Sequence, residues 1–200
     1  MRLVNHFVQG GSWSGNSNRW GDIFDPATGQ RIGQVRLASK VDVDAVVAIA
    51  QKAQGGWAAT PPAKRAAVMF DFRDRLYRHI DELAALISRE HGKTLADAKG
   101  EIARGIEVVE FACGIPHLLK GEYAEQVAAA VDSYSVRQPL GVVAGITPFN
   151  FPAMVPLWMY PISLACGNAF VLKPSEKDPS VVIRVAELLQ EAGLPAGVFN

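Results

Sequence analysis

The fold of this chain is indicated by the stretch GVVAGITPFNFP at residues 141–152. Residues 141–146 form a continuous apolar run, typical of a strand buried on both faces, and residues 169–172 (AFVL) form a second such run. Between them, residues 153–166 have the length of a helix, although Pro161 should kink it. The pattern therefore predicts a strand–helix–strand unit.

The same alternation continues to the end of the sequence. Residues 179–192 are typical of an amphipathic helix, and residues 197–199 begin a third strand. This order is half of a doubly wound nucleotide-binding sheet, which binds ligands at the carboxyl ends of its strands, here residues 147–150 and 173–177. We expect an α/β, Rossmann-like sheet that is incomplete, because its third strand has only begun at Asn200.

A β-hairpin and several helices are predicted to precede this sheet. DPATG at residues 25–29 is turn chemistry between two strand-like segments. Ser39 and Asp42 form a capping-box signature, and helical apolar patterns follow as far as Cys113. The second of these helices should place one set of apolar side chains on a single face: Ala66, Met69, Phe70, Leu76, Tyr77 and Ile80.

Composition narrows the class of protein. With 49% hydrophobic residues in 200, the chain has enough apolar side chains for a folded core. Twenty basic residues balance twenty acidic ones, which argues against nucleic acid as a partner. Cys113 and Cys166 are too few for a disulfide framework and lack the spacing of metal ligands, so no metal site is expected. Without a leader-like or membrane-spanning stretch, we expect a cytoplasmic protein.

Asn150 is a candidate catalytic residue. It follows the first predicted strand, where a dinucleotide fold usually carries a glycine-rich phosphate loop, but neither G-x-G-x-x-G nor a P-loop is present. Prolines at 148 and 152 should make this loop rigid, which leaves the amide of Asn150 able to donate to a developing oxyanion. The alternative is that this side chain only satisfies the backbone of the turn.

Lys173 and Glu176 are candidate cofactor residues. They close the second predicted strand, where an acidic side chain commonly accepts hydrogen bonds from the adenosine ribose and a lysine can add another. The alternative is a solvated loop start. Their place at the carboxyl end of a strand–helix–strand unit makes both interpretations tenable.

Arg104 is a candidate anion-binding residue. The helix that contains it is apolar on two sides, so its guanidinium is expected to be covered and to need an anion. That anion could be a ligand. It could equally be Glu101, Glu107 or Glu110 in a structural ion pair.

Four segments together resemble the aldehyde dehydrogenase superfamily. ITPFNFP (146–152), KPSE (173–176) and GLPAGVFN (193–200) keep the order and spacing of that family, and DPATG (25–29) fits its N-terminal hairpin. The resemblance covers essentially the whole chain. It implies the N-terminal part of the aldehyde dehydrogenase fold.

Within that superfamily the chain is most similar to the CoA-acylating methylmalonate-semialdehyde dehydrogenases. This likeness rests on Phe149, on MVPLWM (154–159), and on EVVEFA (107–112), which follows Arg104. The resemblance implies NAD-dependent oxidation of methylmalonate or malonate semialdehyde through a cysteine thioester, which coenzyme A takes up to give propionyl-CoA or acetyl-CoA with loss of CO2.

The resemblance also implies a role for each candidate residue. Asn150 would hold the oxyanion, and Arg104 would bind the substrate carboxylate. Lys173 and Glu176 would hold the adenosine ribose, with Lys177 at the edge of the adenosine site. Thr147 and Phe149 would line the cofactor by backbone contacts. The implied nucleophilic cysteine lies beyond Asn200. We expect neither Cys113 nor Cys166 to replace it, because no cationic side chain adjoins them in the sequence, so residues 1–200 alone should be inactive.

The domain organisation follows from the same likeness. We expect N-terminal hairpin and helices of the cofactor domain over 1–120, an extended oligomerisation arm over 121–138, and the first part of the NAD-binding unit over 139–200. The arm implies a homotetramer or homodimer, although an ordinary surface hairpin is the alternative. The other functions that stay open are a non-acylating aldehyde dehydrogenase for another substrate and a non-catalytic dinucleotide-binding or assembly module.

Overall fold

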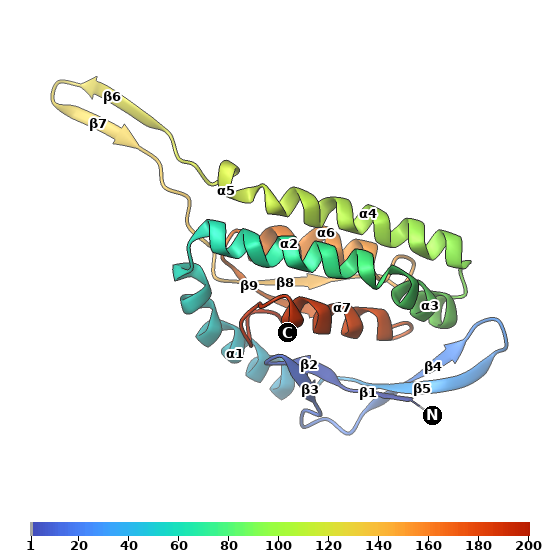
Figure 1. The fold of residues 1–200 in the computed structure, drawn as a ribbon. Coiled ribbons are helices and arrows are strands. Elements are labelled where there is room, and N and C mark those ends of the chain that lie inside the picture. The colour runs from blue at the N-terminus through green and yellow to red at the C-terminus, as the bar shows by residue number, and fades with distance from the viewer. Residues whose placement is uncertain (1) are drawn as a thin grey trace.

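A computed structural model describes residues 2–200 (Figure 1). The strands are β1 (Arg2–Val4), β2 (His6–Val8), β3 (Gly11–Trp13), β4 (Trp20–Asp25), β5 (Gln30–Arg36), β6 (Tyr123–Ala128), β7 (Val131–Tyr134), β8 (Val142–Ile146) and β9 (Ala169–Lys173). The helices are α1 (Lys40–Ala59), α2 (Pro62–Arg78), α3 (Ile80–His91), α4 (Leu95–Cys113), α5 (Ile115–Leu118), α6 (Met154–Ala165) and α7 (Ser180–Glu191).

The strand–helix–strand unit predicted from residues 141–172 is confirmed. Strands β8 and β9 are parallel, with Ile146 opposite Lys173, and α6 connects them. A third parallel segment adds to β9, since the Phe170 N–H donates to the Val198 carbonyl at 2.8 Å and the Asn200 N–H donates to the Phe170 carbonyl at 3.1 Å. Strand β9 therefore lies between its two neighbours, and the carboxyl ends of β8 and β9 lie side by side.

The prediction that the first of these strands is buried on both faces is wrong. In β8 only Gly145 is buried, and Ile146 is 78% exposed. Within residues 2–200, β8 pairs with β9 alone and is therefore an edge strand. An apolar run predicts a buried strand only where further elements pack on both of its faces.

The N-terminal hairpin is also confirmed, and it is part of a larger sheet. Strands β4 and β5 pair antiparallel around the 25–29 turn, and β1 adds to β5 in parallel, giving the order β1–β5–β4. Strands β2 and β3 form a separate antiparallel pair. The three short strands before β4 were not expected from the sequence, because three residues are too few to show a two-residue period.

Helix α1 begins where its capping residues indicate, but one apolar face of α2 was misjudged. Ser39 and Asp42 form the complete capping box at the start of α1. In α2, however, Phe70 and Tyr77 are about half exposed, whereas Phe72 is wholly buried. Helix α2 also ends at Arg78, so the apolar stripe predicted through residue 80 continues into a different helix.

One hydrophobic core joins the helices to the parallel strands. Helix α6 packs against α4, and both α6 and α1 contact the β8–β9 pair. Gly105 allows the close approach of α4 to α6, since a Cβ at this position would lie 2.6 Å from Cδ1 of Leu157. This contact brings the middle of α4 next to the loop that follows β8.

Strands β6 and β7 form a hairpin that stands away from the rest of the molecule (Figure 1). All residues of both strands are exposed, including large apolar side chains such as Tyr123, Val127 and Tyr134. Among residues 2–200, no helix combines the length and apolar character needed to cross a lipid bilayer.

Candidate active site

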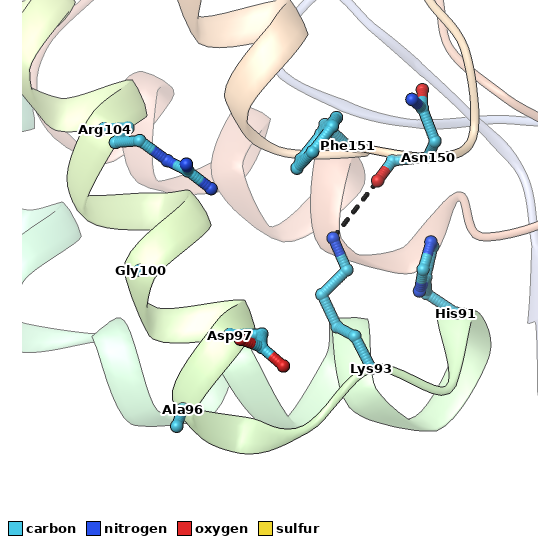
Figure 2. Close-up of a pocket in the computed structure, with 8 residues that line it drawn as sticks. All are labelled: His91, Lys93, Ala96, Asp97, Gly100, Arg104, Asn150 and Phe151. Atoms are coloured by element: carbon cyan, nitrogen blue, oxygen red, sulfur yellow. Dashed lines mark hydrogen bonds between the residues drawn. The ribbon is translucent and has the colours of Figure 1, made fainter.

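A cavity of about 760 Å³ opens between α4 and the loop after β8 (Figure 2). Its lining residues come from the end of α3, from the connection between α3 and α4, from α4 and from the loop after β8: His91, Lys93, Ala96, Asp97, Gly100, Arg104, Asn150 and Phe151. Two candidate residues from the sequence, Arg104 and Asn150, therefore share one cavity although they are 46 positions apart in the chain.

The backbone of Asn150 is anchored at the cavity, and its side chain is exposed. Lys93 donates a hydrogen bond from Nζ to the carbonyl oxygen of Asn150 at 3.1 Å, while the side-chain amide lies on the other side of the loop backbone (Figure 2). Within residues 2–200 this amide forms no hydrogen bond to the turn. The alternative in which it satisfies the turn backbone is therefore not observed.

Arg104 is exposed, so the prediction that its guanidinium is covered is wrong. The second apolar side of α4 is open to solvent in this structure, as the 54% exposure of Phe111 shows. Helical spacing predicts which residues share a side, but it does not say what packs there. The Arg104 guanidinium lies 5.8 Å from the centre of the Phe151 ring, at the wall of the cavity.

The alternative of a structural ion pair for Arg104 is not observed within residues 2–200. Glu101 pairs with Lys93, and Glu110 lies 3.4 Å from Arg73. Among residues 2–200, neither these carboxylates nor Glu107 forms a salt bridge with Arg104. Within the described part of the chain, the guanidinium is therefore a charged donor without an anionic partner, at the wall of an open cavity.

Sequence reasoning missed the Lys93–Glu101 pair as part of the site. Glu101 is wholly buried, and its side chain reaches the start of α6, where it accepts hydrogen bonds from the backbone N–H groups of Ala153 and Met154 at 2.8 and 3.1 Å. A signal was present, because Glu101 occupies the core face of α4 beside Ile102, and a buried carboxylate needs partners.

The cofactor candidates gather at the carboxyl ends of the two parallel strands. Thr147 follows β8, and its N–H donates to the carbonyl of Lys173 at 3.1 Å. Lys173 and Glu176 form an exposed ion pair of 3.0 Å. A backbone N–H and the Lys173 ammonium keep the pKa of Glu176 below its usual range, so this carboxylate is ionised at neutral pH and can accept hydrogen bonds.

Aromatic contacts connect the two loops. The ammonium of Lys177 lies 4.2 Å from the centre of the Phe149 ring, and the His91 ring is 6.5 Å from the same ring. Thr147 is buried, and within the described residues its hydroxyl has no hydrogen-bond partner. The candidate residues from 147 to 150 and from 173 to 177 thus form one continuous region.

Comparison with known proteins gives the family of this chain. The sequence profile of the aldehyde dehydrogenase family matches residues 13–200. This chain belongs to that family. A malonate-semialdehyde dehydrogenase of Pseudomonas aeruginosa is 52% identical over 200 residues, which are 100% of this chain and 40% of the relative.

Solved aldehyde dehydrogenase structures share the fold. A protein of Sinorhizobium meliloti 1021, solved in complex with NAD, has 56% sequence identity and a TM-score of 0.98, over 100% of this chain and 41% of that one. A methylmalonate-semialdehyde dehydrogenase of Oceanimonas doudoroffii has 54% identity and a TM-score of 0.97, with 100% and 41% of the two chains covered. The chain thus spans about 40% of the length of these aldehyde dehydrogenases and corresponds to the N-terminal portion of their fold.

The two cysteines of this aldehyde dehydrogenase chain are protonated thiols. Burial raises the pKa of Cys113 and of Cys166. The sequence interpretation overlooked their cationic neighbours, because Arg73 lies near Cys113 and Arg65 near Cys166 in space rather than in sequence. Both arginines lower the thiol pKa, but burial outweighs them, so neither thiolate is favoured at neutral pH.

Proposed function

We propose that this chain carries the substrate- and NAD-binding side of a CoA-acylating methylmalonate- or malonate-semialdehyde dehydrogenase. The observation that supports this most is the Arg104 guanidinium, which has no anionic partner among residues 2–200 and faces the same cavity as Asn150. The similarity to malonate- and methylmalonate-semialdehyde dehydrogenases supports the same substrate class.

Arg104 would bind the carboxylate of the semialdehyde. A planar guanidinium can donate two parallel hydrogen bonds to a carboxylate, which fixes the direction of the substrate as well as its charge. With the carboxylate held at α4, the aldehyde end of the acid would extend toward the loop that carries Asn150. An uncharged aldehyde would lack this anchor.

Asn150 would stabilise the oxyanion that forms when a thiolate adds to the aldehyde carbon. Its amide N–H is free of the turn, and the loop that carries it is anchored through its backbone, so the loop itself needs little reorganisation. The thiolate would not come from the buried Cys113 or the partly buried Cys166, because burial raises the pKa of both thiols. We therefore propose that residues 1–200 alone do not turn over aldehyde.

The residues at the ends of β8 and β9 fit NAD. Glu176 is ionised and exposed, Lys173 adjoins it, and both lie where parallel sheets bind a ribose. Thr147 and Phe149 would contact the cofactor through their backbone, and Lys177, held over the Phe149 ring, would lie at the adenosine edge. NAD, when bound, would accept the hydride that leaves the aldehyde carbon.

Coenzyme A would be the co-substrate that takes up the acyl group, with loss of CO2. We further propose that residues 121–138 are an oligomerisation arm and that the protein is a homotetramer or homodimer. The exposed apolar side chains of β6 and β7 support this, since they find no cover within residues 2–200. We also propose domain limits of 1–120, 121–138 and 139–200, and the separation of the β6–β7 hairpin from the rest of the molecule supports them.

The test is an assay of the complete gene product with methylmalonate semialdehyde, with malonate semialdehyde and with NAD, in the presence and absence of CoA. We expect NADH formation that requires CoA for sustained turnover, with propionyl-CoA or acetyl-CoA as product. Equal NADH formation with a free acid as product and no CoA would contradict the acylating reaction and favour a hydrolytic aldehyde dehydrogenase.

A further inference from the structure

A buried ion pair connects α4 to the loop that carries Asn150. The Glu101 side chain is fully buried and that of Lys93 is only 11% exposed, yet both are charged groups in contact. A buried ion pair contributes little net stability by itself, because the cost of desolvation offsets the attraction. The main effect of this ion pair is therefore expected in the other groups that the two side chains bind.

Glu101 serves as the N-terminal cap of α6. This helix has no capping side chain of its own, and Oε1 of Glu101 instead accepts the N–H groups of Ala153 and Met154. The positive end of the helix dipole and two otherwise unpaired N–H groups thus stabilise the carboxylate. The start of α6 is fixed to α4 as a result.

Lys93 extends the same connection to Asn150. Its ammonium is paired with Oε2 of Glu101 and donates its other hydrogen bond to the Asn150 carbonyl at 3.1 Å (Figure 2). It also lies 4.6 Å from the centre of the Phe151 ring. The loop from 150 to 154 is therefore held at both ends, at Asn150 by Lys93 and at the first turn of α6 by Glu101.

We propose that Glu101 and Lys93 are positioning residues that fix the backbone from which the Asn150 amide reaches the reacting oxygen. This inference rests on the proposed function, in which Asn150 is the oxyanion donor. Both residues act through Asn150 and do not touch the substrate in this role. The competing explanation is that the pair serves only to hold the fold together.

A double-mutant cycle in the complete gene product separates these explanations. The variants are Glu101→Gln, Asn150→Ala and their combination, with Glu110→Gln as the matched control, because Glu110 is an exposed carboxylate on the same helix. We expect Glu101→Gln to lower kcat about tenfold or more, since a displaced catalytic group costs up to about a hundredfold. KM for NAD should stay unchanged, and Glu110→Gln should leave kcat unaffected.

In the Asn150→Ala background, the same Glu101→Gln change should lower kcat by less than about twofold, because residues that act through one another are non-additive. An equal loss of kcat in both backgrounds, or no loss in either, would overturn the proposal. If Asn150→Ala itself leaves kcat unchanged, the oxyanion assignment fails. If only Glu101→Gln is without effect, the positioning role fails alone.

A second variant covers the possibility that Glu101→Gln does not fold. Combining Glu101→Gln with Lys93→Met removes both charges, so neither remains buried without its partner. We expect this protein to fold, to bind NAD with unchanged affinity and to show the same loss of kcat. If this variant also fails to fold, or folds with full kcat, the pair is a structural element only and the proposal is wrong.

Discussion

Asp178, just after the cofactor loop, gives the sharpest prediction about stability. Its side chain is 2% exposed, and within residues 2–200 neither carboxylate oxygen has a hydrogen-bond partner. Burial raises the pKa of Asp178 from 3.8 to about 7, with Glu90 and Glu101 adding to the rise and Ser175 and Lys93 opposing it. The folded protein therefore holds a proton here that the unfolded chain releases.

The sign of the pH dependence follows from this difference. Because the folded-state pKa is raised, the favourable contribution of protonated Asp178 is complete below the unfolded value of 3.8 and is lost as pH rises to about 7. A rise of three units corresponds to about 4 kcal/mol, since each unit is worth about 1.4 kcal/mol. Local relaxation and entry of water reduce this figure, so about 2 to 4 kcal/mol is expected.

Asp178→Asn removes the titration and keeps the shape of the side chain. The measurement is the denaturant midpoint of the complete gene product at pH 5 and at pH 8.5, for wild type, for Asp178→Asn and for the exposed control Asp81→Asn. We expect the variant to gain stability relative to wild type between the two pH values, and the control to show no such gain. A stability difference between wild type and Asp178→Asn that is the same at both pH values would refute the reasoning.

Three further predictions follow from other contacts. Gly105→Ala should destabilise the fold by about 1 to 3 kcal/mol, because the added methyl group would overpack against Leu157. The control Gly100→Ala on the same helix should be neutral or slightly stabilising, because no atom lies near its added Cβ. Chemical denaturation measures both variants, and equal effects would contradict the close contact between α4 and α6. Cys166→Ser should leave aldehyde oxidation by the complete gene product nearly intact, because this thiol keeps its proton. Loss of turnover in a folded Cys166→Ser variant would disprove this prediction. Glu176→Gln should raise KM for NAD about tenfold with kcat unchanged, because a hydrogen bond to a charged group is lost. Steady-state kinetics measures this, and an unchanged KM for NAD would show that Glu176 does not bind the cofactor.

Local signals in the sequence were sufficient for much of the fold. The capping box at Ser39, the turn at residues 25–29 and the apolar runs on either side of α6 each depend on residues close in the chain. They predicted the right elements in the right order. The meeting of residues 147–150 with 173–177 followed from the general geometry of parallel strands.

Long-range contacts were beyond those signals. Helical periodicity placed Arg104 on an apolar side of α4, but whether that side is covered depends on elements elsewhere, and the guanidinium is exposed. The Lys93–Glu101 pair and its bonds to residues 150–154 likewise join segments about 50 positions apart. No spacing rule predicts which carboxylate caps a distant helix.

The most direct test of the proposed function concerns the Arg104 guanidinium, which lines the same cavity as Asn150 and has no anionic partner within residues 2–200. In the complete gene product, KM for malonate semialdehyde and for uncharged propanal is measured for wild type, Arg104→Ala and Arg104→Lys. We expect Arg104→Ala to raise KM for the carboxylated substrate about 10- to 100-fold, the value of a hydrogen-bonded charge pair, and to change KM for propanal by less than about twofold. Arg104→Lys keeps the charge but loses the bidentate hydrogen bonds, so its KM for malonate semialdehyde should lie between those of wild type and Arg104→Ala. An equal change in KM for both aldehydes, or none for either, would contradict a role of Arg104 in binding the substrate carboxylate.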